Sequence, residues 1–165
     1  MIRLLKKEDF DAAAALVNAG WRQTYARYVN PALLREEACA ERARALRADF
    51  ESGRLAECVW EESGKVLALL SMGSTADEEP VGAFEIWRLY VARKAQGRGI
   101  GGRMLAFAEA YVRERGFSEA VIWAFRENRR AVAFYQKYGY QIEREEALGE
   151  PYFADGVRLL KHLSR

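Results

Sequence analysis

Glycines are concentrated in one short stretch whose chemistry is the binding of an anion. Four of the residues from 97 to 102 are glycine. They follow an apolar, β-branched and aromatic run, Ile86 to Ala92, that predicts a strand. The spacing of apolar residues from Ile100 onward predicts a helix. Glycines leave the N–H groups of the first helical turn uncovered at the positive end of the helix dipole, so the stretch predicts a site for a pyrophosphate, with Arg98 and Arg103 adding positive charge.

Three other interpretations of these glycines remain to be weighed. A tight glycine turn before a core helix would serve structure alone. A P-loop ends in Gly-Lys-Ser/Thr, which Gly101-Gly102-Arg103 does not supply. The Gly-x-Gly-x-x-Gly spacing of a dinucleotide-binding fold is present, but Arg93 to Gln96 separate the glycines from the strand and only one strand–helix unit follows, so NAD binding is the less favoured alternative.

The elements that must position this stretch are predicted from periodicity and from turn residues. They come in the order strand, two helices, three strands, helix, strand, helix, two strands. This order predicts one domain, 1–165, with a mixed α/β sheet and helices on both of its faces. The predicted strands lie near 2–5, 56–61, 65–73, 85–92, 120–125, 140–148 and 152–163.

Capping residues give the predicted ends of the helices. The first helix has its candidate stop at Gly20. Asn30-Pro31 predicts the start of a second helix that runs to Gly53, since Asn is a good cap and Pro suits the first turn. The last helix is expected to begin after Asn128 and to close at Gly139.

Composition excludes several classes of function. A net charge of +2 over 165 residues is too small to indicate nucleic acid binding. No apolar run approaches the length that spans a membrane, and the N-terminus has no signal peptide pattern. A single histidine, His162, leaves no cluster for a metal. Cys39 and Cys58 are isolated and indicate free thiols in a reducing cytoplasm.

Two motifs resemble those of a known family. Gln96-x-x-Gly99-x-Gly101 resembles the acetyl-CoA motif of the GCN5-related N-acetyltransferase (GNAT) superfamily, and Asn128-x-x-Ala131-x-x-Phe134-Tyr135-x-Lys137-x-Gly139-Tyr140 resembles its second signature. The resemblance implies a mostly antiparallel sheet of about seven strands. In that fold the two central parallel strands, here 85–92 and 120–125, splay apart.

The resemblance also implies how acetyl-CoA would bind. The pantetheine arm of coenzyme A would pair with Leu89 and Val91 as a substitute strand. The pyrophosphate would lie on the amides of residues 98–102, and Gln96 would order the loop. The residues expected to bind the cofactor are Leu89, Tyr90, Val91, Gln96, Gly97, Arg98, Gly99, Ile100, Gly101, Gly102, Arg103, Asn128, Ala131 and Tyr135.

Acetyl transfer to an amine needs a proton acceptor, a donor to the thioester carbonyl and an acid for the leaving thiolate. The backbone N–H groups of residues 89–91 can serve the carbonyl. Tyr135 is at the family's tyrosine position, and the resemblance implies that it is the acid that protonates the leaving thiolate. Glu85 is the candidate base, because strand alternation places it on one face with Leu89 and Val91; the alternative is a rim carboxylate that attracts a cationic acceptor. This direct reaction requires no metal.

The acceptor is predicted to be a primary amine of a small molecule or a peptide. Its aromatic walls would come from Trp21, Tyr25, Trp87, Trp123, Tyr152 and Phe153, although aromatic residues at such spacing also build cores. Its acidic rim would come from Asp77, Glu78, Glu79, Glu145, Glu146 and Glu150. The alternative function is a non-catalytic regulatory domain that binds coenzyme A. Homodimerisation through the last two strands is left open.

Overall fold

The computed structural model describes residues 1–77 and 83–164. Their strands form one seven-stranded sheet in the order β1-β2-β3-β4-β5-β7-β6. Every neighbouring pair is antiparallel except β4 and β5, which are parallel. The strands are β1 (Ile2–Leu4), β2 (Ala56–Glu62), β3 (Lys65–Ser74), β4 (Phe84–Val91), β5 (Glu119–Phe125), β6 (Gln141–Ala147) and β7 (Asp155–His162).

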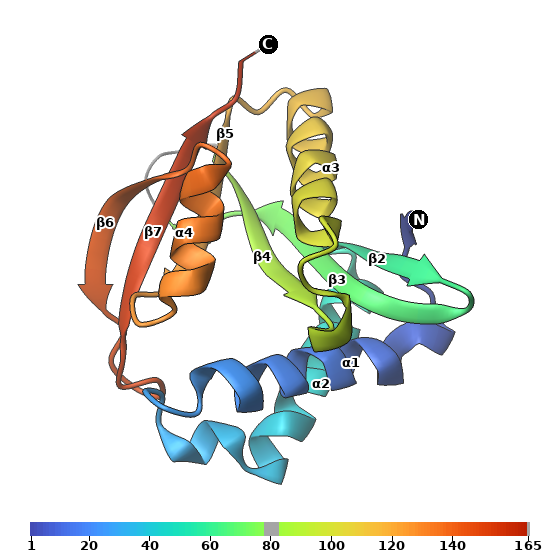
Figure 1. The fold of residues 1–165 in the computed structure, drawn as a ribbon, viewed down its shortest axis with the longest axis vertical. Helices are drawn as coiled ribbons and strands as arrows, with labels where there is room; N and C mark the ends of the chain where they lie inside the picture. Colours follow the sequence, from blue (N-terminus) through green and yellow to red (C-terminus); the bar gives the residue numbers. More distant parts are fainter. Residues whose placement is uncertain (78–82, 165) are drawn as a thin grey trace.

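Helices cover both faces of the sheet, as predicted (Figure 1). One buried cluster joins the sheet to α1 and α2 through Phe10, Leu46 and Val59. Another joins it to α3 through Met104 and Ile122. Alternate residues of a strand face opposite sides, which is how one sheet supplies both clusters. The helices are α1 (Phe10–Gly20), α2 (Glu36–Ser52), α3 (Ile100–Glu114) and α4 (Arg129–Lys137), with short turns η1 (Lys7–Asp9), η2 (Trp21–Tyr25), η3 (Pro31–Leu34) and η4 (Arg93–Ala95).

The central parallel strands separate along their length. β4 and β5 are paired only from Phe84 to Ile86, opposite residues 120–122. β4 remains paired with β3 up to Val91, and β5 remains paired with β7 up to Phe125. The second halves of β4 and β5 therefore diverge, which confirms the predicted splay (Figure 1).

A β-bulge at Trp87 changes which side chains of β4 share a face. Arg88 is opposite Ser71, but Ile86 is opposite Met72, so Trp87 is an extra residue on β4. Ile86 and Leu89 both join the α3 side of the core, although three positions separate them. The predicted common face of Glu85, Leu89 and Val91 is therefore wrong, because the inserted residue shifts the alternation between them.

The helical segments of the N-terminal third differ from the prediction in two places. α1 ends at Gly20 as expected, but the chain continues in the π-helical turn η2. The predicted helix from Asn30 to Gly53 is two helices, η3 and α2, because Arg35 between them is extended. Two glutamates open α2, where negative charge interacts well with the helix dipole. Gly53, in the left-handed region at φ +68°, ends α2 as predicted.

The C-terminal elements follow the prediction closely. Asn128 caps α4 by accepting a hydrogen bond from the backbone N–H of Ala131. Gly139, with φ +91°, follows α4. None of the helices among the described residues is long and apolar enough to cross a membrane.

Candidate functional site

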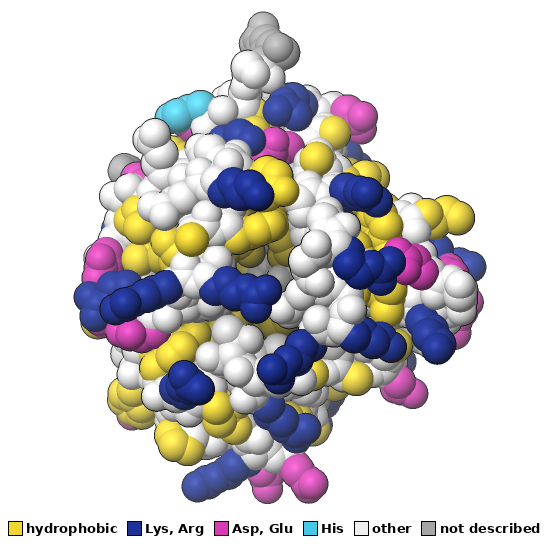
Figure 2. Space-filling model, in the orientation of Figure 1, with side chains coloured by type: hydrophobic (Ala, Val, Ile, Leu, Met, Phe, Trp, Pro, Cys, Tyr) yellow, Lys and Arg dark blue, Asp and Glu magenta, His cyan; other side chains and the backbone are white. Residues whose placement is uncertain are grey.

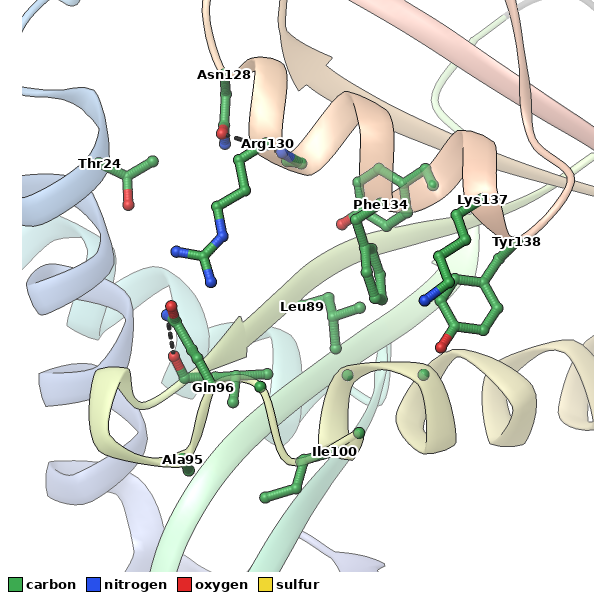
Figure 3. Close-up of a pocket in the computed structure, with 17 residues that line it drawn as sticks. Thr24, Leu89, Ala95, Gln96, Ile100, Asn128, Arg130, Phe134, Lys137 and Tyr138 are labelled. Carbon is green, nitrogen blue, oxygen red and sulfur yellow. Dashed lines mark hydrogen bonds between the residues drawn. The ribbon is translucent and has the colours of Figure 1, made fainter.

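Backbone N–H and C=O groups of β4 point into the gap between β4 and β5. The Ala92 N–H donates to the carbonyl of Leu67 on the β3 side, at 2.8 Å. Alternate residues of an antiparallel strand bond to the same neighbour, so Tyr90 directs its N–H and C=O toward β3. Leu89 and Val91 consequently direct theirs into the gap. Gln96 Nε2 donates to the Val91 carbonyl at 3.1 Å, which ties the following loop to the end of the strand (Figure 3).

The glycine loop ends in uncovered N–H groups at the start of α3. Gly97 and Gly99 have φ values of +77° and +76°, which side chains rarely tolerate. Gly99 is the N-cap of α3 and provides no side-chain cap. The first N–H groups of the helix thus have no intrahelical partner and lie at the positive end of its dipole, which is the predicted anion site.

The next two glycines allow α4 to approach α3. A Cβ on Gly101 would lie 3.2 Å from the Phe134 ring, and a Cβ on Gly102 would lie 2.1 Å from the Tyr138 hydroxyl. A side chain at Gly102 would therefore displace the Tyr138 ring, and one at Gly101 would press on Phe134. The sequence predicted that both glycines bind the cofactor.

The loop and α4 enclose a cavity of about 490 Å³, here called the glycine-loop cavity. Its volume lies within the range of ligand pockets. Of the residues predicted to bind the cofactor, all but three line it. Its lining is Thr24, Leu89, Val91, Ala95, Gln96, Gly97, Gly99, Ile100, Gly101, Gly102, Asn128, Arg130, Ala131, Phe134, Tyr135, Lys137 and Tyr138.

The three exceptions are Tyr90, Arg98 and Arg103. The Tyr90 ring packs on the α1 side of the sheet. Arg98 forms an ion pair with Glu62, N to O 2.7 Å, and the Arg103 guanidinium lies 5.5 Å from the centre of the Trp60 ring. Both arginine side chains therefore engage β2, and neither lines the cavity.

Sequence reasoning missed two basic residues of α4. Arg130 points from α4 toward Gln96, and Lys137 lies beside Tyr138 over the start of α3 (Figure 3). Both line the glycine-loop cavity. The signal was available, since positions 130, 134, 137 and 138 recur at the spacing of one helix face. On the molecular face in Figure 2, Lys and Arg side chains outnumber acidic ones around a central hollow.

A second cavity, of about 420 Å³, adjoins the first and is here called the aromatic cavity. Five of the six predicted aromatic walls line it, namely Trp21, Tyr25, Trp87, Trp123 and Tyr152. Phe125 lines it too and was missed; its ring centre is 4.9 Å from that of Tyr25. Phe153, also predicted as a wall, is instead 62% exposed and does not line the cavity.

Four residues line both cavities: Leu89, Asn128, Ala131 and Tyr135. The Tyr135 side chain is buried, with 8% of its surface exposed. This burial raises the pKa of the Tyr135 phenol, with a smaller contribution from Tyr90, so the phenol stays protonated at neutral pH. A proton donor is thus positioned where the two cavities meet.

Glu85 lines the aromatic cavity and is buried at 5% exposure. Its Oε2 accepts a hydrogen bond from the Thr75 hydroxyl at 2.9 Å. Burial raises the pKa of the Glu85 carboxyl to about 7; Asp77 also raises it, whereas Thr75 and Arg158 lower it. A carboxyl that titrates near neutral pH suits a general base.

Asp77 is the second carboxylate of the aromatic cavity. Its Oδ2 accepts hydrogen bonds from Trp123 Nε1 at 2.9 Å and from Arg158 Nε at 2.8 Å. Arg88, which sequence reasoning missed, lines the cavity as well, but it forms ion pairs with Asp49 and Glu57 at 2.8 and 3.4 Å. The cavity therefore combines aromatic walls with carboxylates.

Three other members of the predicted acidic rim, Glu145, Glu146 and Glu150, do not line the cavity. Glu145 and Glu146 lie on the exposed strand β6, and Glu150 is exposed in the β6–β7 connection. Glu78 and Glu79 lie outside the described residues. Within residues 1–77 and 83–164, no three His, Cys, Asp or Glu side chains group as metal ligands would.

Comparison with known proteins finds a family match over most of the chain. Residues 17–140 match the acetyltransferase (GNAT) family. The spermidine N(1)-acetyltransferase of Thermoplasma acidophilum is 26% identical, over 86% of this chain and 88% of that protein.

Solved structures share the fold across nearly the whole chain. The ribosomal-protein-alanine N-acetyltransferase of Brucella melitensis has a TM-score of 0.76 at 24% identity and covers 99% of both chains. The PaiA N-acetyltransferase of Thermoplasma acidophilum, solved in complex with coenzyme A, has a TM-score of 0.69 at 20% identity, with 94% of this chain and 96% of that one covered.

Proposed function

The chain belongs to the acetyltransferase (GNAT) family, and on this premise we propose that it transfers an acetyl group from acetyl-CoA to a small cationic amine. The glycine-loop cavity is the cofactor site in this proposal, and the aromatic cavity is the acceptor site. The solved complex of a structural neighbour with coenzyme A supports the choice of cofactor.

The residues of the glycine-loop cavity fit the parts of coenzyme A. A pyrophosphate needs N–H donors and positive charge, which the first turn of α3 with Arg130 and Lys137 can supply. A pantetheine arm carries amides that pair with backbone, and Leu89 and Val91 direct backbone groups into the gap. When bound, acetyl-CoA supplies an activated acetyl group as a thioester.

Tyr135 and Glu85 supply the proton transfers of the proposed reaction. The acceptor amine gives a proton to the Glu85 carboxylate, directly or through water, and its nitrogen forms the bond to the acetyl carbon. The carbon–sulfur bond breaks, the Tyr135 phenol gives its proton to the sulfur, and the second proton that leaves the nitrogen restores the phenol. The Leu89 and Val91 N–H groups face the gap and can stabilise charge on the carbonyl oxygen.

The lining of the aromatic cavity supports an acceptor that is cationic and has an apolar body. The Glu85 carboxylate favours a positive nitrogen, whereas Asp77 is already paired with Arg158, and aromatic rings bind both apolar surface and cations. The spermidine acetyltransferase relative acts on a cationic amine, which agrees with this charge. The buried free thiols of Cys39 and Cys58 suit the reducing cytoplasm proposed from the sequence.

The separation of β4 from β5 beside the glycine loop is the observation that supports the proposal most directly. Calorimetry should show binding of acetyl-CoA and none of NAD. A thiol-release assay with a panel of primary amines should then show turnover with small cationic members. Binding of acetyl-CoA without turnover on any amine would favour the regulatory alternative, and preferential binding of NAD would refute the cofactor assignment.

A further inference from the structure

Two connections that are distant in the sequence are joined beside the aromatic cavity. The backbone N–H of Asn30, between η2 and η3, donates to the Tyr152 carbonyl at 3.0 Å. The Asn30 Nδ2 donates to the Pro151 carbonyl, also at 3.0 Å. In Figure 1 the β6–β7 connection reaches the segment that follows α1. Asn30 therefore clasps the β6–β7 connection to the N-terminal third of the chain.

The orientation of the Asn30 amide is fixed from both ends. Its Oδ1 accepts a hydrogen bond from the Ala32 N–H at 3.1 Å, which caps η3. The NH₂ group is thereby directed to Pro151. An asparagine satisfies both requirements because it holds an acceptor and a donor on one planar group.

The clasp holds an aromatic roof, defined as Trp21, Tyr25, Phe125 and Tyr152. The Tyr152 ring stacks on Trp21 with centres 6.3 Å apart and planes 25° apart. It meets Phe125 edge-on at 5.8 Å. All four rings line the aromatic cavity. The roof thus joins three separate parts of the chain above the acceptor site.

Asn30 anchors the connection from the N-terminal third, whereas β6 and β7, paired up to Ala147 and Asp155, hold it from the sheet. All seven residues of β6 are exposed. The connection is closed on itself by hydrogen bonds from Phe153 N–H to Gly149 O at 2.7 Å and from Leu148 N–H to Ala154 O at 2.9 Å. These bonds shape the connection but do not fix its position over the cavity.

We propose that Asn30 and Tyr152 determine acceptor specificity by restricting the aromatic cavity to compact amines. The inference rests on the proposed function and names its substrate class: a primary amine on a short apolar or aromatic body. A peptide that extends beyond its first residue would have to displace the roof. Relatedness does not make this choice, since the similar proteins include a spermidine and a ribosomal-protein-alanine acetyltransferase.

The test compares two acceptors that present a similar aromatic group beside the amine. They are 2-phenylethylamine and a lysine-free hexapeptide with an N-terminal phenylalanine. The native protein should have a kcat/KM at least tenfold higher for 2-phenylethylamine. Equal use of both acceptors would overturn the inference and leave the proposed function intact, whereas no turnover with any amine would count against the proposed function itself.

Two variants distinguish the hydrogen bond from Asn30 to Pro151 from the one by which Asn30 caps η3. Asn30→Asp keeps an oxygen acceptor for Ala32 but removes the donor to Pro151. It should raise KM for 2-phenylethylamine about 3- to 10-fold, the range expected for one neutral hydrogen bond, with kcat within about twofold. The preference over the hexapeptide should fall accordingly.

Tyr152→Ala removes one ring of the roof, the one stacked on Trp21, without touching the cap of η3, and should raise KM for 2-phenylethylamine by at least as much. Unchanged acetyl-CoA affinity in calorimetry verifies that each variant is folded. If both variants keep the native KM values and the native preference, the roof does not select the acceptor and the inference is wrong.

Discussion

The two cavities that meet at Tyr135 are built in different ways. The glycine-loop cavity is formed mainly by two short stretches, 89–102 and 128–138, with backbone N–H groups and glycines at its centre. The aromatic cavity is formed by side chains from several separate segments between Trp21 and Tyr152. Backbone groups can bind the same cofactor whichever side chains surround them. Side chains that differ between proteins can choose the acceptor.

The cavities also differ in charge. Basic side chains of α4 accompany the helix dipole in the first. The carboxylates of Glu85 and Asp77 line the second, where Arg88 is paired with Asp49 and Glu57. An anionic cofactor and a cationic acceptor would thus each meet opposite charge. If this division holds, substitutions in one cavity should change the affinity for one substrate only, and substitutions at the junction should change kcat.

The largest effect is expected at the junction. Tyr135→Phe removes the phenolic proton and should lower kcat about 100-fold or more, the range of general acid catalysis. The affinity for acetyl-CoA in calorimetry should stay within about twofold, because the ring remains and no bond to the cofactor is required of the hydroxyl. A kcat close to the native value would assign Tyr135 to the core alone.

Glu85→Gln should produce the next largest loss, about 10- to 100-fold in kcat/KM at pH 8, without weakening acetyl-CoA binding. In the native protein the carboxyl, with its pKa of about 7, becomes protonated as the pH falls and can no longer accept a proton. The pH profile of kcat/KM should therefore bend downward below pH 7, and the variant should lack this bend. A variant that retains the bend would make Glu85 a rim carboxylate.

The pH dependence of thermal stability tests the raised pKa of Glu85 independently of activity. Because burial raises its pKa, folding favours the protonated form, and the stability associated with it is lost as the pH rises through about 7. Glu85→Gln, which stays neutral, should therefore gain thermal stability over the native protein at pH 8 and not at pH 4.

Gly99→Ala tests the other cavity with a smaller effect. The left-handed φ of +76° should cost alanine about 1 kcal/mol of stability and displace the loop. The Kd for acetyl-CoA should rise about tenfold, with the acceptor KM unchanged. Gly64→Ala is the matched control, since Gly64 has φ +72° and open space around it in the β2–β3 turn. If both variants weaken acetyl-CoA equally, the loop has no special role.

The smallest effect is expected at Thr75, which bonds to Glu85. Thr75→Val removes a hydrogen bond that lowers the pKa of Glu85, so the acid bend of the pH profile should move to higher pH. Thr75→Ser keeps the hydroxyl and should keep the native bend. Identical profiles for the two variants would show that the hydroxyl does not tune this carboxyl.

Local features were predictable because their causes are local. Left-handed backbone at Gly99 requires glycine, Asn128 caps α4 with its own side chain, and helix and strand periods follow from the positions of apolar residues. The order of elements, the glycine loop and the expected identity of the cofactor therefore followed from the sequence and its motifs.

The tertiary structure decided what depends on contacts between distant residues. The bulge at Trp87 reversed the predicted face of Glu85. Arg98, predicted to bind the cofactor, forms an ion pair with Glu62 and does not line the cavity. The raised pKa of Glu85 comes from burial, which depends on the residues packed around it and cannot be seen in the sequence position itself. The clasp between Asn30 and Tyr152 joins residues more than a hundred positions apart, and only the folded chain brings them together.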